Sequence, residues 1–189
     1  MLSFDEIKDA VSRLMGKKRF KHTLGVVEAA TRLAERYGVN LDEARLAALL
    51  HDCAKEMPLQ AMQHLVRGST YDVDDEMLQN GALLHGLAGM VRAERDFAVT
   101  NRDVLEAIRV HTTGKVGMSK LDKIIFLADY IEPNREFPGV DMLRKAADED
   151  LDTAVLLGYD TTLRYLLDQQ LSIYPLTILG RNDILRSCK

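Results

Sequence analysis

The chain is poor in the residues that cross-link small secreted proteins or interrupt regular structure. Its 189 residues include two cysteines, Cys53 and Cys188, which follow no repeated spacing. This usage argues against a disulfide framework and a thiolate metal site, and it favours a reducing compartment. The 12 glycines and 4 prolines make up about 8% of the chain, below the usual roughly 12%. The scarcity favours long helices joined by short turns.

Long apolar runs are missing as well. The longest, at residues 46–50 and 124–128, are much shorter than the roughly 18 residues that span a bilayer. Asp5 and Glu6 precede the first apolar run, which is unlike a secretory signal peptide. We therefore expect a cytoplasmic protein without a membrane partner.

The chain also has no excess of positive charge. Its 25 basic and 29 acidic residues give a net charge of −4, with both signs interspersed. This balance argues against a partner that is a nucleic-acid polymer, because such a partner needs a basic face that releases counterions. A small phosphate ligand is not excluded, since it needs only a few cations in one pocket. The apolar fraction of 47% excludes a mainly disordered chain.

Apolar residues recur at helical spacing along most of the chain. Ser3 and Glu6 have the spacing of a capping box, and Ser119 and Asp122 open another helix in a similar way. The pattern predicts helices at 4–14, 17–37, 41–53, 58–68, 74–95, 101–111, 119–131, 140–147 and 150–170. A weak point at Gly81, a loop at 132–138 and a tail at 171–189 complete this outline. We expect an all-α fold, with residues 1–189 forming a single domain, a helical bundle.

The most apolar helix, predicted for 41–53, ends with His51 and Asp52. A His-Asp dipeptide carries little information by itself, but its setting does. A carboxylate at the end of a buried helix must be paired, hydrogen-bonded or bound to a cation. We interpret the neighbouring Cys53 as a small buried hydrophobe and His64, in another short helix, as structural.

Candidate metal ligands lie on, or at the ends of, five different predicted helices. They are His22, His51, Asp52, His85, His111 and Asp129. A helical bundle can gather such side chains in its core, although any one histidine taken singly is more often an ordinary core or surface residue. Imidazole and carboxylate without thiolate suit iron, manganese or zinc. Six ligands exceed the needs of one tetrahedral ion, and the two oxygens of Asp52 can bridge a pair of ions.

Candidate phosphate contacts lie beside these residues in the sequence. Arg19 precedes His22 by three positions and so shares its helix face. Lys55 follows Asp52 by three, and Arg135 lies in the loop after Asp129. The hydroxyl of Thr112 would lie near any metal on His111. Three other basic residues lie near Arg19, namely Lys17, Lys18 and Lys21. We interpret most of them as part of a solvated helix face.

The ligand series as a whole resembles the HD-domain metal-dependent phosphohydrolase superfamily. Four longer motifs are more specific, and they lie at residues 19–26, 49–55, 107–114 and 128–135. The first contains Arg19-x-x-His22, the second contains His51-Asp52-x-Ala54-Lys55, and the last runs from Ala128 to Arg135. They resemble the HD-domain symmetrical bis(5′-nucleosyl)-tetraphosphatase family of the YqeK type. The similarity extends from about residue 4 to residue 183, and the motif at 128–135 is its most discriminating part.

The resemblance implies an all-α fold with two metal ions, iron first and manganese or zinc as alternatives. His22, His51, Asp52 and Asp129 would hold one ion, and Asp52 would bridge to a second ion on His85 and His111. Asp52, Lys55 and Arg135 would be the catalytic residues. The implied nucleotide contacts are Arg19, Lys55, His85, His111, Thr112, Arg135, Ser172, Ile173, Tyr174, Pro175, Leu176 and Thr177, with Asn182 beyond them. Family members often carry an aromatic residue where this chain has Arg181.

The implied activity is symmetric cleavage of diadenosine tetraphosphate to two ADP by a hydroxide held between the two ions. A 5′-nucleotidase or other nucleotide phosphohydrolase on the same scaffold is an alternative, as is a non-catalytic nucleotide-sensing module. A cyclic dinucleotide phosphodiesterase is disfavoured, because no Gly-Tyr-Pro motif occurs: Gly158-Tyr159 is followed by Asp160. The sequence leaves a homodimer open, since Leu166, Leu167 and Leu171 fit either a core or an interface.

Overall fold

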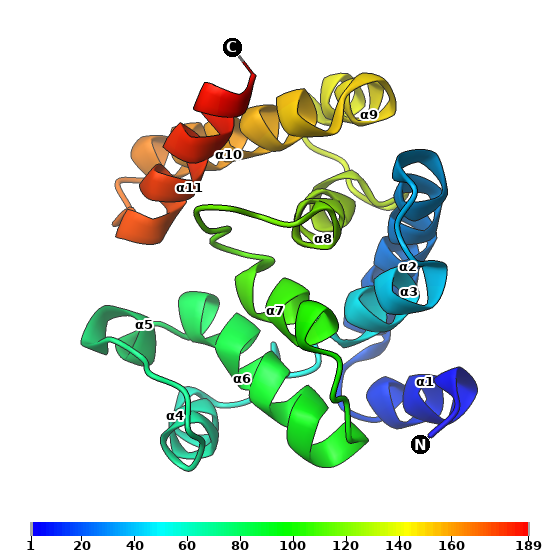
Figure 1. Cartoon of the computed structure of the whole chain (residues 1–189). Helices are drawn as coiled ribbons and strands as arrows, with labels where there is room; N and C mark the ends of the chain where they lie inside the picture. Colours follow the sequence, from blue (N-terminus) through cyan, green and yellow to red (C-terminus); the bar gives the residue numbers. More distant parts are fainter. Residues whose placement is uncertain (1, 189) are drawn as a thin grey trace.

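The computed structural model describes residues 2–188, and this part of the chain is all-helical, as predicted. Figure 1 shows the arrangement. The helices are α1 (Phe4–Ser12), α2 (Lys17–Tyr37), α3 (Leu41–Leu50), α4 (Leu59–Arg67), α5 (Asp75–Gln79), α6 (Gly81–Phe97), α7 (Arg102–Val110), α8 (Lys120–Ile131), α9 (Val140–Glu149), α10 (Leu151–Asp168) and α11 (Pro175–Ser187).

Short polar side chains begin most of these helices by accepting hydrogen bonds from free backbone N–H groups. Ser3 and Ser119 complete the two predicted capping boxes with Glu6 and Asp122. Asn40 caps α3 in the same manner. These contacts are local in sequence, which is why the pattern predicts most helix starts correctly.

The weak point predicted at Gly81 is a break: Asn80 has an extended backbone that ends α5, and its side chain caps α6, which begins at Gly81. The prediction was wrong in two further places. Pro58 is the N-cap of α4, and not its first helical residue. The tail expected at 171–189 contains the helix α11, with Pro175 at its first position.

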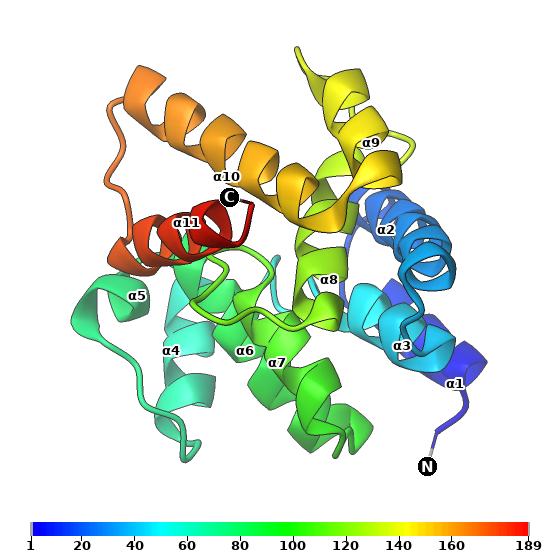
Figure 2. The same ribbon diagram turned by 45° about the horizontal axis from the view of Figure 1, so that its top comes forward.

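Helix α8 lies in the middle of the bundle, in contact with α2, α3, α7, α9 and α10. The turned view in Figure 2 shows the same central position. Its residues 124–128 are at most 1% exposed. The apolar run at 124–128 is therefore the axis of the core, and the ends of the surrounding helices come together beside it.

The segment between α7 and α8 is fixed against the C-terminal helices by the buried ring of Tyr159. Gly114 in this segment has a φ of +62°, and a Cβ atom there would overlap the Tyr159 hydroxyl. Gly180 of α11 packs on the same hydroxyl. This contact ties α11 to the segment that follows His111.

The apolar residues near the end of α10 are not part of the core. Leu167 and Leu171 are 64% and 51% exposed, and Leu166 is half-buried. The homodimer that the sequence leaves open stays a prediction. Within residues 2–188, no helix is both long enough and apolar enough to cross a membrane.

We predict that Gly114→Ala lowers the free energy of unfolding by about 3 kcal/mol or more, because left-handed backbone strain and overlap with Tyr159 add. Gly117→Ala is the matched control. It lies in the same segment with a φ of +69° and an open Cβ position, so it should cost only about 1–2 kcal/mol. Urea unfolding of both variants measures the difference, and equal losses would contradict the packing role of Gly114.

Candidate metal centre

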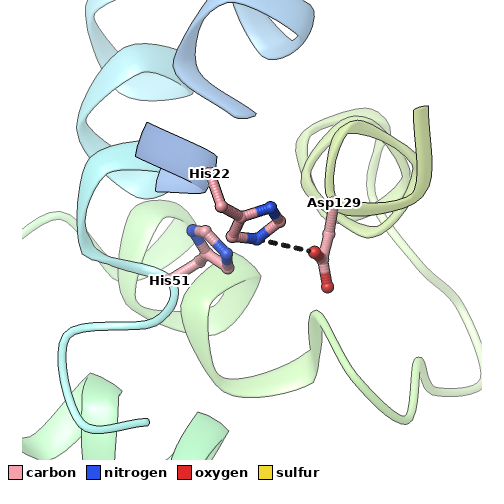
Figure 3. A group of neighbouring side chains, drawn as sticks. All are labelled: His22, His51 and Asp129. Atoms are coloured by element: carbon pink, nitrogen blue, oxygen red, sulfur yellow. Dashed lines mark ion pairs between the residues drawn. The ribbon is translucent and has the colours of Figure 1, made fainter. Parts of the chain in front are cut away.

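The six predicted ligands converge on one buried point although they come from five parts of the chain. His22 lies on α2, His85 on α6 and Asp129 near the end of α8, whereas His51 and His111 cap the ends of α3 and α7. Asp52 follows His51 in the turn after α3. His51, His85, His111 and Asp52 are at most 3% exposed. Figure 3 shows His22, His51 and Asp129 facing one another.

The four imidazole rings form a continuous row. The centroids of His22 and His51 are 5.6 Å apart, those of His51 and His111 are 5.0 Å apart, and those of His111 and His85 are 4.9 Å apart. The Nε2 atoms of His85 and His111 approach to 3.0 Å. Such a row brings several nitrogen donors within reach of a small ion.

Asp52 divides this row into two halves. Its Oδ2 lies 3.5 Å from Nε2 of His51 and 3.8 Å from Nε2 of His22, and the latter is 3.1 Å from Asp129 Oδ1. Its Oδ1 lies 3.3 Å from Nε2 of His85 and 3.6 Å from Nε2 of His111. Each carboxylate oxygen therefore faces a separate pair of imidazoles, which is the arrangement of a bridging ligand.

The donor atoms suit metal ions. Nδ1–H of His51 donates to the Ala48 carbonyl at 2.6 Å, and Nδ1–H of His111 donates to the Ile108 carbonyl at 2.7 Å. These bonds leave Nε2 as the atom with the free lone pair. Nε2 of His22 and of His51 is buried without a hydrogen-bond partner, which costs about 1–3 kcal/mol in a protein interior unless something binds there. The site therefore fits divalent cations, which prefer neutral imidazole and ionised carboxylate.

The charge states of Asp52 and His85 agree with that interpretation. Burial raises the pKa of Asp52, but the surrounding imidazoles of His51, His85 and His111 outweigh it, so the pKa lies well below its ordinary value. Against the effect of burial, the Asp52 charge in turn raises the pKa of His51. Burial lowers the pKa of His85 to about 4. At neutral pH the bridging carboxylate is ionised and His85 is neutral.

Glu132 is a functional candidate that the sequence analysis missed. Its buried carboxylate accepts from Nδ1–H of His22 at 3.2 Å and from the Asn134 backbone and side-chain N–H groups at 2.7 and 2.9 Å. A Cβ atom at Gly25 would overlap Glu132 Oε2, so Gly25 makes room for this carboxylate. Together they fix the orientation of the His22 ring. The available signal was the acidic residue directly after Ile131, at the end of a buried helix.

The predicted phosphate contacts surround the same cluster. Arg19 Nη1 donates to Asp52 Oδ2 at 2.8 Å, and Arg135 Nη2 donates to Asp129 Oδ1 at 2.6 Å. Lys55 Nζ lies 3.4 Å from His85 Nε2. Thr112 Oγ1 lies 3.2 Å from His85 Nε2 and 3.1 Å from His111 Nε2. Three cations and a hydroxyl thus border the two carboxylates.

The C-terminal stretch predicted to contact nucleotide lies apart from the ligands. Within the described residues, 172–177 make no hydrogen bond or ion pair with the six of them. Tyr174 instead donates its hydroxyl proton to Asp74, at the start of α5. Arg181, where the family often has an aromatic residue, donates to Asp160 of α10 at 2.8 Å. His64, interpreted as structural, is exposed, and Cys53 is buried as expected.

Comparisons with known proteins agree with this fold and cluster. The family model described as the HD domain matches residues 19–134, the span from Arg19 to the loop that holds Asn134. A solved structure from Clostridium acetobutylicum, described as a predicted HD superfamily hydrolase involved in NAD metabolism, superposes with a TM-score of 0.95. It is 45% identical, and the match covers 99% of each chain.

Curated relatives carry a narrower name. A protein of Halalkalibacterium halodurans is 42% identical over 88% of this chain and 89% of its own length, and one of Bacillus subtilis is 37% identical over 94% and 95%. Both are named bis(5′-nucleosyl)-tetraphosphatase, symmetrical. The chain belongs to the HD-domain family and, within it, to the group of enzymes that carry this name.

We predict that Asp52→Ala reduces the metal content of the purified protein to well below that of the wild type, because it removes one oxygen from each half of the cluster. Inductively coupled plasma mass spectrometry after dialysis measures the content. His64→Ala is the control, since His64 is exposed and belongs to neither group of candidate ligands. Wild-type metal content in Asp52→Ala would contradict the bridging role.

We predict that Glu132→Gln weakens metal affinity roughly 10–100-fold, because an amide cannot accept from both His22 and Asn134 in the same way. Competition with a fluorescent chelator measures the affinity directly. Glu136→Gln, four positions on and exposed, should leave it unchanged. If both variants bind metal equally well, Glu132 does not position His22.

Proposed function

We propose that the protein hydrolyses dinucleoside tetraphosphates symmetrically, with diadenosine tetraphosphate and water giving two ADP. The observation that carries this proposal is the carboxylate of Asp52, shared between two pairs of imidazoles and bordered by Arg19, Lys55 and Arg135. Two adjacent cation sites beside several basic side chains suit phosphoanhydride cleavage. The names of the curated relatives support the choice of substrate.

His22, His51, Asp52 and Asp129 would hold one ion, and Asp52, His85 and His111 the other. We propose iron first, with manganese and zinc as alternatives, because all three accept imidazole and carboxylate. A bound pair of such cations polarises phosphoryl oxygens and makes a water molecule more acidic.

The cationic side chains hold the substrate. The guanidinium groups of Arg19 and Arg135 lie against the ligand carboxylates, where each can grip phosphate oxygens with two parallel N–H groups. Lys55 adds a third charge beside His85, and the Thr112 hydroxyl donates to a further phosphate oxygen. These groups stabilise the negative charge that develops on the leaving phosphate.

The bond changes follow from the products. The water oxygen bonds to one of the two phosphorus atoms that flank the central bridging oxygen, and the bond from that phosphorus to the bridging oxygen breaks. The bridging oxygen leaves with the second ADP as part of its terminal phosphate. Both protons of the water are lost, since two fully ionised ADP molecules carry two more negative charges than the substrate, and they are released to solvent at neutral pH.

We further propose that Ser172, Ile173, Tyr174, Pro175, Leu176 and Thr177 bind the nucleoside of one half. Ile173, Tyr174 and Leu176 are only half-buried at the start of α11 and offer aromatic and apolar surface to a base. The domain would then comprise residues 1–189, with this stretch completing the nucleotide site. A cytoplasmic location and a homodimer stay predictions.

The decisive experiment identifies the products of diadenosine tetraphosphate by ion-exchange chromatography with metal-loaded wild-type protein. We expect two ADP per substrate and, in ¹⁸O-labelled water, one labelled β-phosphate per pair of ADP molecules. ATP plus AMP would contradict symmetric cleavage. Release of phosphate from AMP, or of triphosphate from a deoxynucleoside triphosphate, would instead favour the other phosphohydrolases, and ADP binding without turnover would favour a sensing module.

A further inference from the structure

A basic recess opens beside the metal centre, between the start of α2 and the loop after α8. It has a volume of about 510 Å³ and is lined by Lys18, Arg19, Lys21 and Arg135 together with His22 and Asn134. The volume falls in the roughly 300–1,000 Å³ range of small-molecule sites. The recess therefore has room for part of a nucleotide and reaches the metal centre through His22.

Basic residues outnumber acidic ones in the recess, with Lys18, Arg19, Lys21 and Arg135 against Glu56 and Glu132. The two carboxylates are turned to other partners: Glu56 accepts from the Gly16 backbone at 2.7 Å, and Glu132 holds His22 and Asn134. Lys18 and Lys21 are exposed, and neither forms an ion pair with any described residue. Two free ammonium groups thus face the recess, although the sequence analysis treated these lysines as a solvated face.

The chemistry of the lining selects phosphate and hydroxyl groups over a base. The side chains of the recess are cations, carboxylates, an amide and one imidazole, with no aliphatic or phenyl residue among them. A base could stack only on His22 or on the guanidinium groups of Arg19 and Arg135, which are held by Glu132, Asp52 and Asp129. A diphosphate and a ribose would find several charged donors.

The position of the recess complements that of the C-terminal stretch. Figures 1 and 2 show α2 on one side of α8 and the start of α11 on the other, next to α5. The metal centre, made from α2, α6 and the ends of α3, α7 and α8, adjoins the recess at His22. A dinucleotide whose middle phosphates lie on the metals must extend in both directions.

We propose that the basic recess is the subsite for the second nucleoside diphosphate half of the substrate. It holds the phosphates and the ribose of that half by charge, and the base faces solvent. This assignment rests on the proposed function and adds to it an unequal recognition of the two halves. The C-terminal stretch recognises the base of one half. The recess recognises the other half only by its diphosphate and ribose.

The test reverses the two free charges in a Lys18→Glu/Lys21→Glu variant. A Lys17→Glu/Arg67→Glu variant carries the same change in net charge at exposed positions that do not line the recess. We expect the KM for diadenosine tetraphosphate to rise about tenfold or more in the recess variant, with kcat within about twofold of wild type. The control variant should stay within about twofold in both parameters, and matching melting curves show that all three proteins are folded.

Salt provides an independent readout. Exposed phosphate contacts are screened by salt, with a Debye length of about 10 Å at 0.1 M, so the KM of wild type should rise with potassium chloride. The slope should be shallower in the recess variant than in wild type and in the control. Equal slopes and equal KM values would overturn the recess assignment and leave the hydrolytic activity in place.

Binding of inorganic pyrophosphate, measured by calorimetry on metal-loaded protein, tests the recess assignment separately from the proposed hydrolytic activity, because it needs no turnover. We expect affinity about tenfold weaker in the recess variant and unchanged in the control. If wild type makes no ADP while this pattern holds, the proposed substrate is wrong and the recess stays a diphosphate site. If all three proteins bind pyrophosphate equally, the recess assignment is wrong whatever the activity.

Discussion

The structure depends on one buried carboxylate. Asp52 is 3% exposed and ionised, and a bare charge at that depth would cost several kcal/mol. The surrounding chain compensates for it with imidazoles from α2, α3, α6 and α7 and with the guanidinium of Arg19. Elements distant in sequence must therefore meet at this point. Replacing Asp52 changes the electrostatics of four helices at once.

Backbone geometry at helix ends gives the ligands their precision. His51 and His111 each lie at the C-terminal end of a helix, and the ring Nδ1–H of each donates to the carbonyl three residues earlier. The helix end therefore sets the orientation of the imidazole ring. His22 lies within a helix whose carbonyls are already used. It takes its orientation from Glu132, which in turn requires the small Gly25.

The sequence alone predicts features that depend on near neighbours. Capping residues such as Ser119 and the apolar run at 124–128 mark helices and core because both effects act within one or two turns. The six candidate ligands can be named from their types and spacing, and the structure brings them together. Glu132 was missed because its partner His22 is 110 positions away. Lys18 and Lys21 are exposed, as predicted, but a sequence does not show whether a cavity lies beside an exposed lysine.

The unequal site that we propose would explain how a symmetric substrate is cut at its centre. The C-terminal stretch is attached to α5 and α10 through Tyr174 and Arg181, and the segment after His111 is held by Tyr159. If the C-terminal stretch binds a base as proposed, packing fixes the separation between that base and the metal ligands. A base anchored at one end then determines which phosphorus reaches Asp52, and the other half needs only to be attracted by charge. Symmetric cleavage in this chain would follow from one rigid spacing, with no requirement for two equivalent nucleotide pockets.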